Sequence, residues 1–117
     1  MRRSSRFNNG VLAALLLAAA PLAAQEEDGP LARGVARLAA WEFREAEAAF
    51  EEAVRKDPTD ALAWAFLGNA RNKQARYAPA AEALERAIAL DPSRRGVRFD
   101  LGVSLFHLGR LPEAKAR

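Results

Sequence analysis

Cysteine is absent from this 117-residue chain, and histidine occurs once, as His107. Without cysteine the chain forms no disulfide, thiolate zinc site, cysteine nucleophile or lipid-modified N-terminal cysteine. A single histidine leaves a hydrolytic or metal site short of the groups that must converge in a pocket. Ser104 lies close to His107 in sequence, but nothing marks it as activated. We therefore expect no enzyme activity, no metal and no cofactor, and we interpret His107 as a partly exposed helix residue.

Aromatic residues are also scarce, at 8% of the chain, whereas 50% of the residues are hydrophobic and many of these are alanine. Alanine is the strongest helix former, and its small side chain lets neighbouring helices approach closely. The composition therefore favours an all-α fold over a sandwich with a bulky core. The length allows one domain.

The net positive charge of +3 is concentrated at the N-terminus. Of the 18 basic residues, Arg2, Arg3 and Arg6 lie in a first segment without acidic side chains, and the others equal the 15 acidic residues in number. A basic start, the apolar run 11–24 and the acidic segment that follows are typical of a secretory signal peptide. We expect a signal peptide over residues 1–24, cleaved after Ala24, and no nucleic-acid partner. The alternative is an uncleaved membrane anchor.

The rest of the chain repeats itself with a period of 34 residues. Shifting the sequence by this period aligns glycine, alanine, bulky apolar and Asp-Pro positions. They are Gly34, Gly68 and Gly102; Ala46, Ala80 and Ala114; Phe43, Tyr77 and Leu111; Ala53 and Ala87; and the pairs Asp57-Pro58 and Asp91-Pro92. A fixed period of this length is the signature of stacked helical repeats.

The central repeat resembles a tetratricopeptide repeat. The residues that carry the resemblance are Trp64, Leu67, Gly68, Tyr77, Ala80, Leu84, Ala87 and Pro92. The resemblance implies an α-solenoid of stacked antiparallel helix pairs over residues 25–117. It implies about 2.7 repeats, at 27–60, 61–94 and 95–117, with the last incomplete. In each repeat the glycine lies where the first helix approaches its partner, and the alanine lies opposite it.

Breaks and caps place the individual helices. We expect helices from about residue 28, at 43–56, 61–74 and 77–90, from about 94 to 108, and a sixth from Leu111. Asp28, Asp60 and Ser93 are the expected caps of the first, third and fifth helices. The first helix is expected to bury Leu31, Val35 and Leu38.

Two further expectations concern surfaces. The glutamates of the second helix are interpreted as its solvated face; they are Glu42, Glu45, Glu47, Glu51 and Glu52. In the fifth helix, Leu101, Leu105, Phe106 and Leu108 have almost nothing after them to cover them. Stacked arrays normally end in a helix with a polar outer face. This contrast predicts that the protein continues past Arg117. The alternative is a small protein with an irregular end.

The resemblance also implies a binding groove along the inner face, lined by the first helix of each pair. The lining positions that matter most are Leu62, Phe66, Asn69, Asn72, Lys73, Phe99, Val103, Phe106 and His107, with Val35, Leu38, Ala39 and Ala65 beside them. Amides at Asn69 and Asn72 are suited to a peptide backbone, and Lys73 to an acid. The alternative is that these three side chains are simply solvated.

One binding mode of the family does not fit this sequence. The clamp that holds a C-terminal carboxylate needs lysine, arginine and asparagine at five groove positions, which here hold Leu31, Val35, Phe66, Gly96 and Asp100. We therefore expect a more apolar ligand.

These observations favour a protein–protein interaction adaptor that is exported to the periplasm or secreted, with a protein or peptide partner and no small-molecule substrate. The membrane is involved only if the signal sequence stays uncleaved. The alternative is the N-terminal module of a longer envelope protein, whose catalytic or membrane part lies beyond residue 117.

Overall fold

A computed structural model describes residues 29–109 of the chain. Over this range the secondary structure is entirely helical, in five helices: α3 (Pro30–Ala39), α4 (Phe43–Lys56), α5 (Ala61–Lys73), α6 (Tyr77–Leu90) and α7 (Arg95–His107). The all-α prediction and the expected bounds of the helices are confirmed to within a residue or two. The signal peptide and the sixth helix were predicted on residues that lie outside this range.

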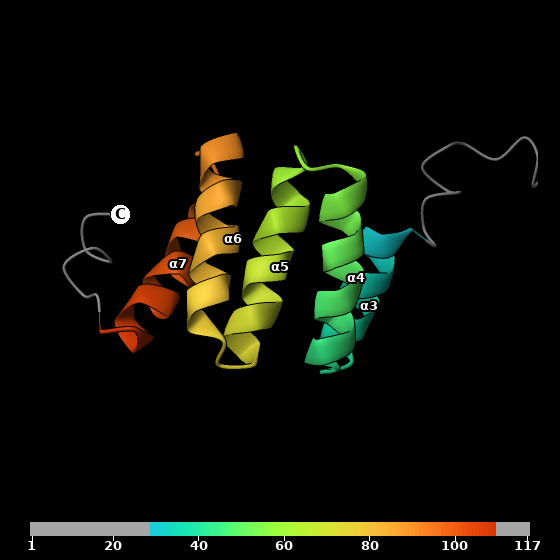
Figure 1. Cartoon of the computed structure of the whole chain (residues 1–117), viewed down its shortest axis with the longest axis horizontal. Coiled ribbons are helices and arrows are strands. Elements are labelled where there is room, and N and C mark those ends of the chain that lie inside the picture. Colours follow the sequence, from blue (N-terminus) through green and yellow to red (C-terminus); the bar gives the residue numbers. More distant parts are fainter. Residues whose placement is uncertain (1–28, 110–117) are drawn as a thin grey trace, which may run out of the picture.

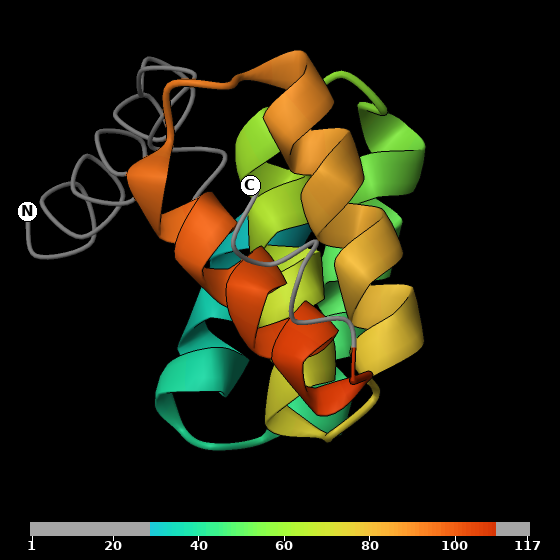
Figure 2. The ribbon, with the colours of Figure 1, turned by 90° about the vertical axis from the view of Figure 1, so that its left-hand side faces the viewer.

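The helices stack as antiparallel pairs, α3 with α4 and α5 with α6, and α7 begins the third unit (Figure 1). Each helix contacts the next one in the chain, and α5 also contacts α3 and α7. The view from the α7 end shows α7 packed across α5 and α6 (Figure 2). The first helices of the units, α3, α5 and α7, therefore form one continuous face, and α4 and α6 form the other. This is an α-solenoid.

The core lies between the helices as two apolar clusters, in which Phe50, Leu67, Leu84, Leu101 and Leu105 are fully buried. Trp64 packs against both clusters, and its indole N–H donates to the carbonyl oxygen of Pro58 at 2.8 Å. Burial of large apolar side chains is the main stabilising term of such a stack.

Two glycines allow the helices of each described pair to approach. A Cβ atom at Gly34 would overlap the ring of Phe50. At Gly68 it would overlap the side chain of Leu84 and lie 3.1 Å from the carbonyl oxygen of Ala80. The predicted role of these glycines is confirmed. Gly102 has no described atom within 4 Å of such a Cβ position, and its predicted partner Ala114 lies outside the described residues.

The turns inside the pairs share one conformation. Trp41, Ala75 and Gly109 each follow the end of a first helix by the same interval, and their φ angles are 63°, 59° and 74°. The amide of Arg76 donates to Arg71 O at 2.9 Å and that of Ala75 to Asn72 O at 2.9 Å, which is the Schellman pattern. Glycine adopts this left-handed conformation freely, whereas another residue pays about 1 kcal/mol or more.

Several local expectations need correction. Asp60 caps α5 as predicted, because its carboxylate accepts from the amides of Leu62 and Ala63. Ser93 does not cap α7: its hydroxyl donates to Asp91 at 2.6 Å, and the N-cap residue is Arg94, without a side-chain cap. The N-cap of α3 is Gly29, also without a side-chain cap, and the expected cap Asp28 lies outside the described residues.

Three burial expectations were also wrong. Val35 is 39% exposed, because α3 turns this residue toward the open face beside α5. Leu101 and Leu105, expected to lack cover, are fully buried against the cluster that contains Leu84 and Ala87 of α6. The preceding repeat covers them, so only Phe106 and Leu108 of that set are exposed.

Candidate functional site

The face formed by α3, α5 and α7 is hollowed on both sides of α5. A hollow of about 690 Å³ lies between α3 and α5, and one of about 380 Å³ lies between α5 and α7. Leu62 and Phe66 line both, so these two side chains form the ridge between them. Phe66 is held by stacking on the buried ring of Phe50, with centroids 5.3 Å apart. The two hollows therefore adjoin across an apolar ridge, and we refer to them together as the groove.

The structure brings only part of the predicted site together. Leu62, Phe66 and Asn69 line the hollow between α5 and α7, together with Leu38 and Ala65. The residues predicted on α7 line a separate hollow of about 380 Å³ along that helix; they are Phe99, Val103, Phe106 and His107. Ala39 and Lys73 are exposed on their helices.

The asparagines of α5 bond to α7. Asn72 donates from Nδ2 to the carbonyl oxygen of Asp100 at 2.9 Å and accepts from the hydroxyl of the buried Ser104 at 2.6 Å. Asn69 donates from Nδ2 to Oδ2 of Asp100 at 3.2 Å. These two amides are part-buried and bonded to α7, so they are not freely solvated, whereas Lys73 is exposed, as the alternative interpretation expected. Whether they also contact a partner remains a prediction.

Asp100 is a groove residue that the sequence placed at a clamp position but that was not among the predicted binding residues. It lines the hollow between α5 and α7 beside Arg94 and Val97. Burial raises the pKa of its carboxyl group, and this effect outweighs the hydrogen bond from Asn69 and the charge of Lys73, which both lower the pKa. The 34-residue period could have identified Asp100, because it aligns this residue with the predicted groove residue Phe66.

The aromatic contacts of His107 are with its neighbours. Its ring stacks on Tyr77 at the start of α6, with centroids 4.2 Å apart and planes 5° apart, and meets Phe106 edge-on. The side chain is exposed, as expected for a surface residue.

Within residues 29–109, no group of three or more potential ligand side chains is placed to hold a metal ion. None of the helices in that range is long and apolar enough to cross a bilayer.

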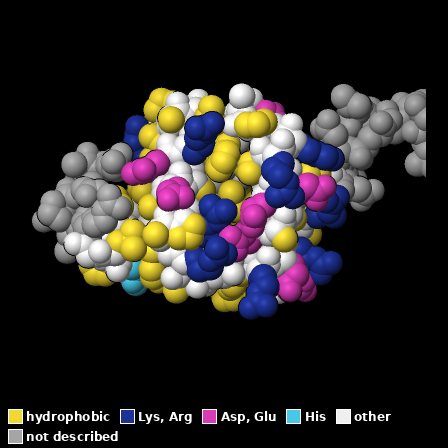
Figure 3. All heavy atoms as spheres, viewed as in Figure 1, with side chains coloured by type: hydrophobic (Ala, Val, Ile, Leu, Met, Phe, Trp, Pro, Cys, Tyr) yellow, Lys and Arg dark blue, Asp and Glu magenta, His cyan; other side chains and the backbone are white. Residues whose placement is uncertain are grey.

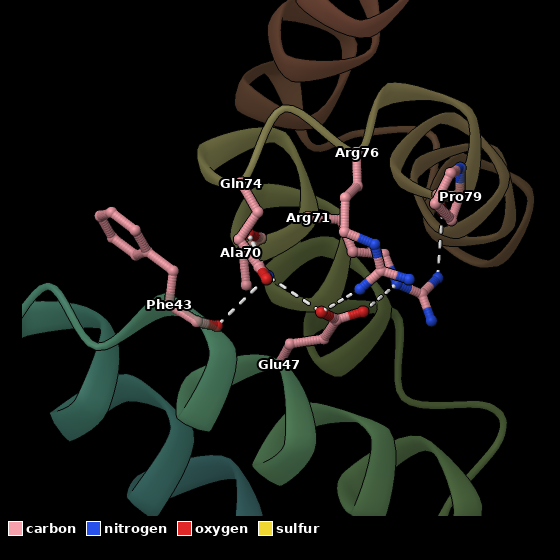
Figure 4. Close-up of polar contacts among 7 residues, drawn as sticks. All are labelled: Phe43, Glu47, Ala70, Arg71, Gln74, Arg76 and Pro79. Atoms are coloured by element: carbon pink, nitrogen blue, oxygen red, sulfur yellow. Dashed lines mark hydrogen bonds and ion pairs between the residues drawn. The ribbon is translucent and has the colours of Figure 1, made fainter.

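A buried polar cluster lies across α5 from the groove. Glu47, expected in the solvated face of α4, is only 4% exposed. Its carboxylate accepts from Arg71 Nε and Gln74 Nε2, both at 2.9 Å, and from Arg76 (Figure 4). Arg71 also donates to the carbonyl oxygen of Pro79 at 3.0 Å. Glu47 therefore ties the first repeat to the second helix pair.

The electrostatics of this cluster follow from its contacts. Burial on its own raises the pKa of Glu47, but the hydrogen bonds from Arg71 and Gln74 and the charges of Arg76 and Arg71 together lower it. In Figure 3 acidic and basic side chains gather at the middle of the face that carries α4, α5 and α6.

The 34-residue period could also have predicted the burial of Glu47, because it aligns this residue with the buried Ala81.

The sequence matches a known family over most of its length. The profile of the family described as tetratricopeptide repeat matches residues 31–94 and residues 71–116. The chain belongs to the tetratricopeptide-repeat family. The helix pairs, the glycine contacts and the groove described above are therefore those of a tetratricopeptide array.

Similar proteins share one stretch of this array. The chain is 39% identical over 66 residues to Superkiller protein 3 of Schizosaccharomyces pombe, which is 56% of this chain and 5% of that protein. It is 38% identical over 65 residues to the peroxisomal targeting signal receptor of Saccharomyces cerevisiae and 40% identical over 65 residues to that of Yarrowia lipolytica. Those matches cover 56% of this chain and 11% of each receptor.

Proposed function

We propose that this protein is a protein–protein interaction adaptor that binds a peptide or a segment of a partner on the face formed by α3, α5 and α7. The observation that carries the proposal is the ridge of Leu62 and Phe66, which lines the hollows on both sides of α5. A concave, mostly apolar surface with a few polar groups is the usual form of a binding site. Arrays of this family present such a surface along their first helices.

The relatives support the same class of function. Two of them are named as receptors for a targeting signal, and the chain matches 11% of the length of each. The proposal takes from them only the role of binding another protein. It does not take their ligand.

The test compares two leucine substitutions on opposite faces. The probe is a phage-displayed library of random peptides of about nine residues, which span about 30 Å when extended. Enriched peptides are then titrated against the wild type, Leu62→Glu and Leu90→Glu. Leu90, at the end of α6, is 38% exposed and lines neither hollow beside α5, so Leu90→Glu is the matched control. We expect Leu62→Glu to weaken binding at least about tenfold and Leu90→Glu to leave it unchanged. Equal affinities for all three proteins, or a library without enriched peptides, would contradict the proposal.

The proposal includes export to the periplasm or secretion. Its support is the sequence of residues 1–24, with three arginines ahead of the apolar run and an acidic segment after it. The intact mass of the protein recovered from the cell envelope tests this point. A mass equal to that of residues 25–117 supports export with cleavage after Ala24. A mass that requires further residues after Arg117 favours the alternative, in which the array is one module of a longer envelope protein.

A further inference from the structure

The carboxylate of Asp100 is held in position by α5 but only half satisfied. Asn69 donates to Oδ2 at 3.2 Å, and Asn72 fixes the backbone carbonyl of the same residue at 2.9 Å. Among residues 29–109 no hydrogen bond reaches Oδ1. Every fully buried side-chain oxygen or nitrogen in that range has a partner, so Oδ1 is not fully buried, and Asp100 lines the hollow between α5 and α7. This oxygen is a free acceptor in a groove with apolar walls.

The described part of the chain supplies no ion pair to this carboxylate. Arg94 lines the same hollow, but its Nε lies 3.2 Å from Oδ2 of Asp91. Lys73 is near enough for its charge to act on Asp100, yet no nitrogen of it lies within ion-pair distance. A charge that is partly removed from water without a partner is unfavourable, and a bound cation relieves this cost.

The two acids at the other end of the groove each accept two hydrogen bonds from their own turn or helix at a single oxygen, Oδ1. Asp60 accepts from the first amides of α5, and Asp57 accepts from the amide and hydroxyl of Thr59 at 3.0 and 2.7 Å. Both line the hollow between α3 and α5, whose other walls include Leu31, Val35 and Phe66. Carboxylates therefore line both hollows. Asp100 differs from Asp57 in that burial raises its pKa, whereas the hydrogen bonds from Thr59 lower the pKa of Asp57.

We propose that Asp100 anchors a lysine or arginine side chain of the bound peptide, while apolar side chains next to that residue contact Leu62 and Phe66. This inference rests on the proposed function and specifies the chemistry of the ligand. Charge complementarity with the open Oδ1 atom selects the cation, and the apolar walls select its neighbours. An acidic peptide would place its charge against Asp100, and the cations that would favour it are Lys73, Arg94 and, in the hollow beside α3, Lys56.

The test uses the full chain and the enriched peptides from the random library. Each peptide is compared with a version in which norleucine replaces its lysine, because norleucine keeps the carbon chain and removes the charge. Both versions are titrated against the wild type, Asp100→Asn and Glu82→Gln. Asp100→Asn keeps the shape of the side chain, and Glu82→Gln makes the same charge change on the exposed surface of α6.

We expect the enriched peptides to contain lysine or arginine beside apolar residues. Norleucine should weaken binding about tenfold for the wild type and for Glu82→Gln, but less than about twofold for Asp100→Asn. Equal losses in all three proteins would overturn the inference, because the cation would then bind elsewhere. Enrichment of acidic peptides that depend on Lys73 would overturn it as well.

A second measurement does not depend on a variant that folds. Carbodiimide joins a carboxylate to a lysine amine within reach, and mass spectrometry identifies the modified residue. A cross-link from the peptide lysine to Asp100 in the wild type is the expected result, and cross-links only to other acids would contradict the inference. Peptides that bind independently of both Leu62 and Asp100 would instead overturn the proposed function, and with it the inference. Peptides that need Leu62 but not Asp100 would overturn the inference alone.

Discussion

Glu47 and Asp100 lie across α5 from each other, and the fold treats these two carboxylates differently. Arg71 of α5 and its C-cap residue Gln74 donate hydrogen bonds to Glu47, whereas Asn69 and Asn72 donate to Asp100. Glu47 receives two guanidinium groups and an amide, and Asp100 receives one side-chain amide. The pKa of Glu47 is lowered and that of Asp100 is raised. Glu47, whose two carboxylate oxygens both have partners, joins two repeats, whereas Asp100 keeps one oxygen without a partner for a ligand in the groove.

The largest expected effect is that of Glu47→Ala on stability. The change leaves Arg71, whose side chain is 16% exposed, without its carboxylate partner between α4 and α6. Breaking a buried pair from one side typically costs about 3 kcal/mol or more. We expect a loss of this order in the free energy of unfolding, measured by urea denaturation.

The control for Glu47→Ala is Glu45→Ala, on the exposed side of the same helix, which should cost less than about 0.5 kcal/mol. Similar losses in both variants would show that Glu47 is a surface residue after all.

The pH dependence of stability should have opposite signs at the two sites. The pKa of Glu47 in the folded protein lies below its ordinary value of 4.5, so its stabilisation is present above that value and is lost as the pH falls through the lowered pKa. The pKa of Asp100 lies above its ordinary value of 3.8, so its contribution is most favourable below that value and is lost as the pH rises through the raised pKa.

Urea unfolding between about pH 3 and pH 7 measures this difference. The stability of the wild type minus that of Glu47→Gln should increase with pH, and the wild type minus Asp100→Asn should decrease. Two curves with the same slope would remove the distinction between the sites.

The smallest expected effect is that of Asp100→Asn on stability. The asparagine keeps the oxygen that accepts from Asn69 and removes a partly buried charge without an ion-pair partner. We expect a change within about 0.5 kcal/mol in the free energy of unfolding at neutral pH. A loss as large as that of Glu47→Ala would assign Asp100 to the architecture and not to the groove.

The sequence was sufficient for the fold because the repeat constrains it at many positions. The same 34-residue period and burial pattern predicted the contact of Gly68 with Leu84, the cap at Asp60 and the helix ends at the Asp-Pro pairs. The turns were harder to predict from the sequence, because Trp41 and Ala75 adopt a left-handed conformation that is uncommon for tryptophan and alanine. There, the helix ends impose the conformation on the residue.

The site was only partly predictable, because its polar contacts join residues far apart in sequence. Leu62 and Phe66 follow from the family pattern, but the bonds of Asn72 to Asp100 and Ser104 span 28 and 32 residues. Glu47 looked like one member of an acidic surface because its partners stand 24 to 29 residues away. The burial of a charged residue depends on those partners, which helix periodicity does not reveal.

The most direct test of the contrast is an NMR titration of the side-chain carboxyl carbons in the wild-type protein. One experiment reports both groups in the same molecule, without a substitution. The account predicts that Glu47 titrates below its ordinary value of 4.5 and that Asp100 titrates above its ordinary value of 3.8. If Glu47 titrates at or above 4.5, or if Asp100 titrates at or below 3.8, the assignment of one carboxylate to the fold and the other to a ligand is wrong.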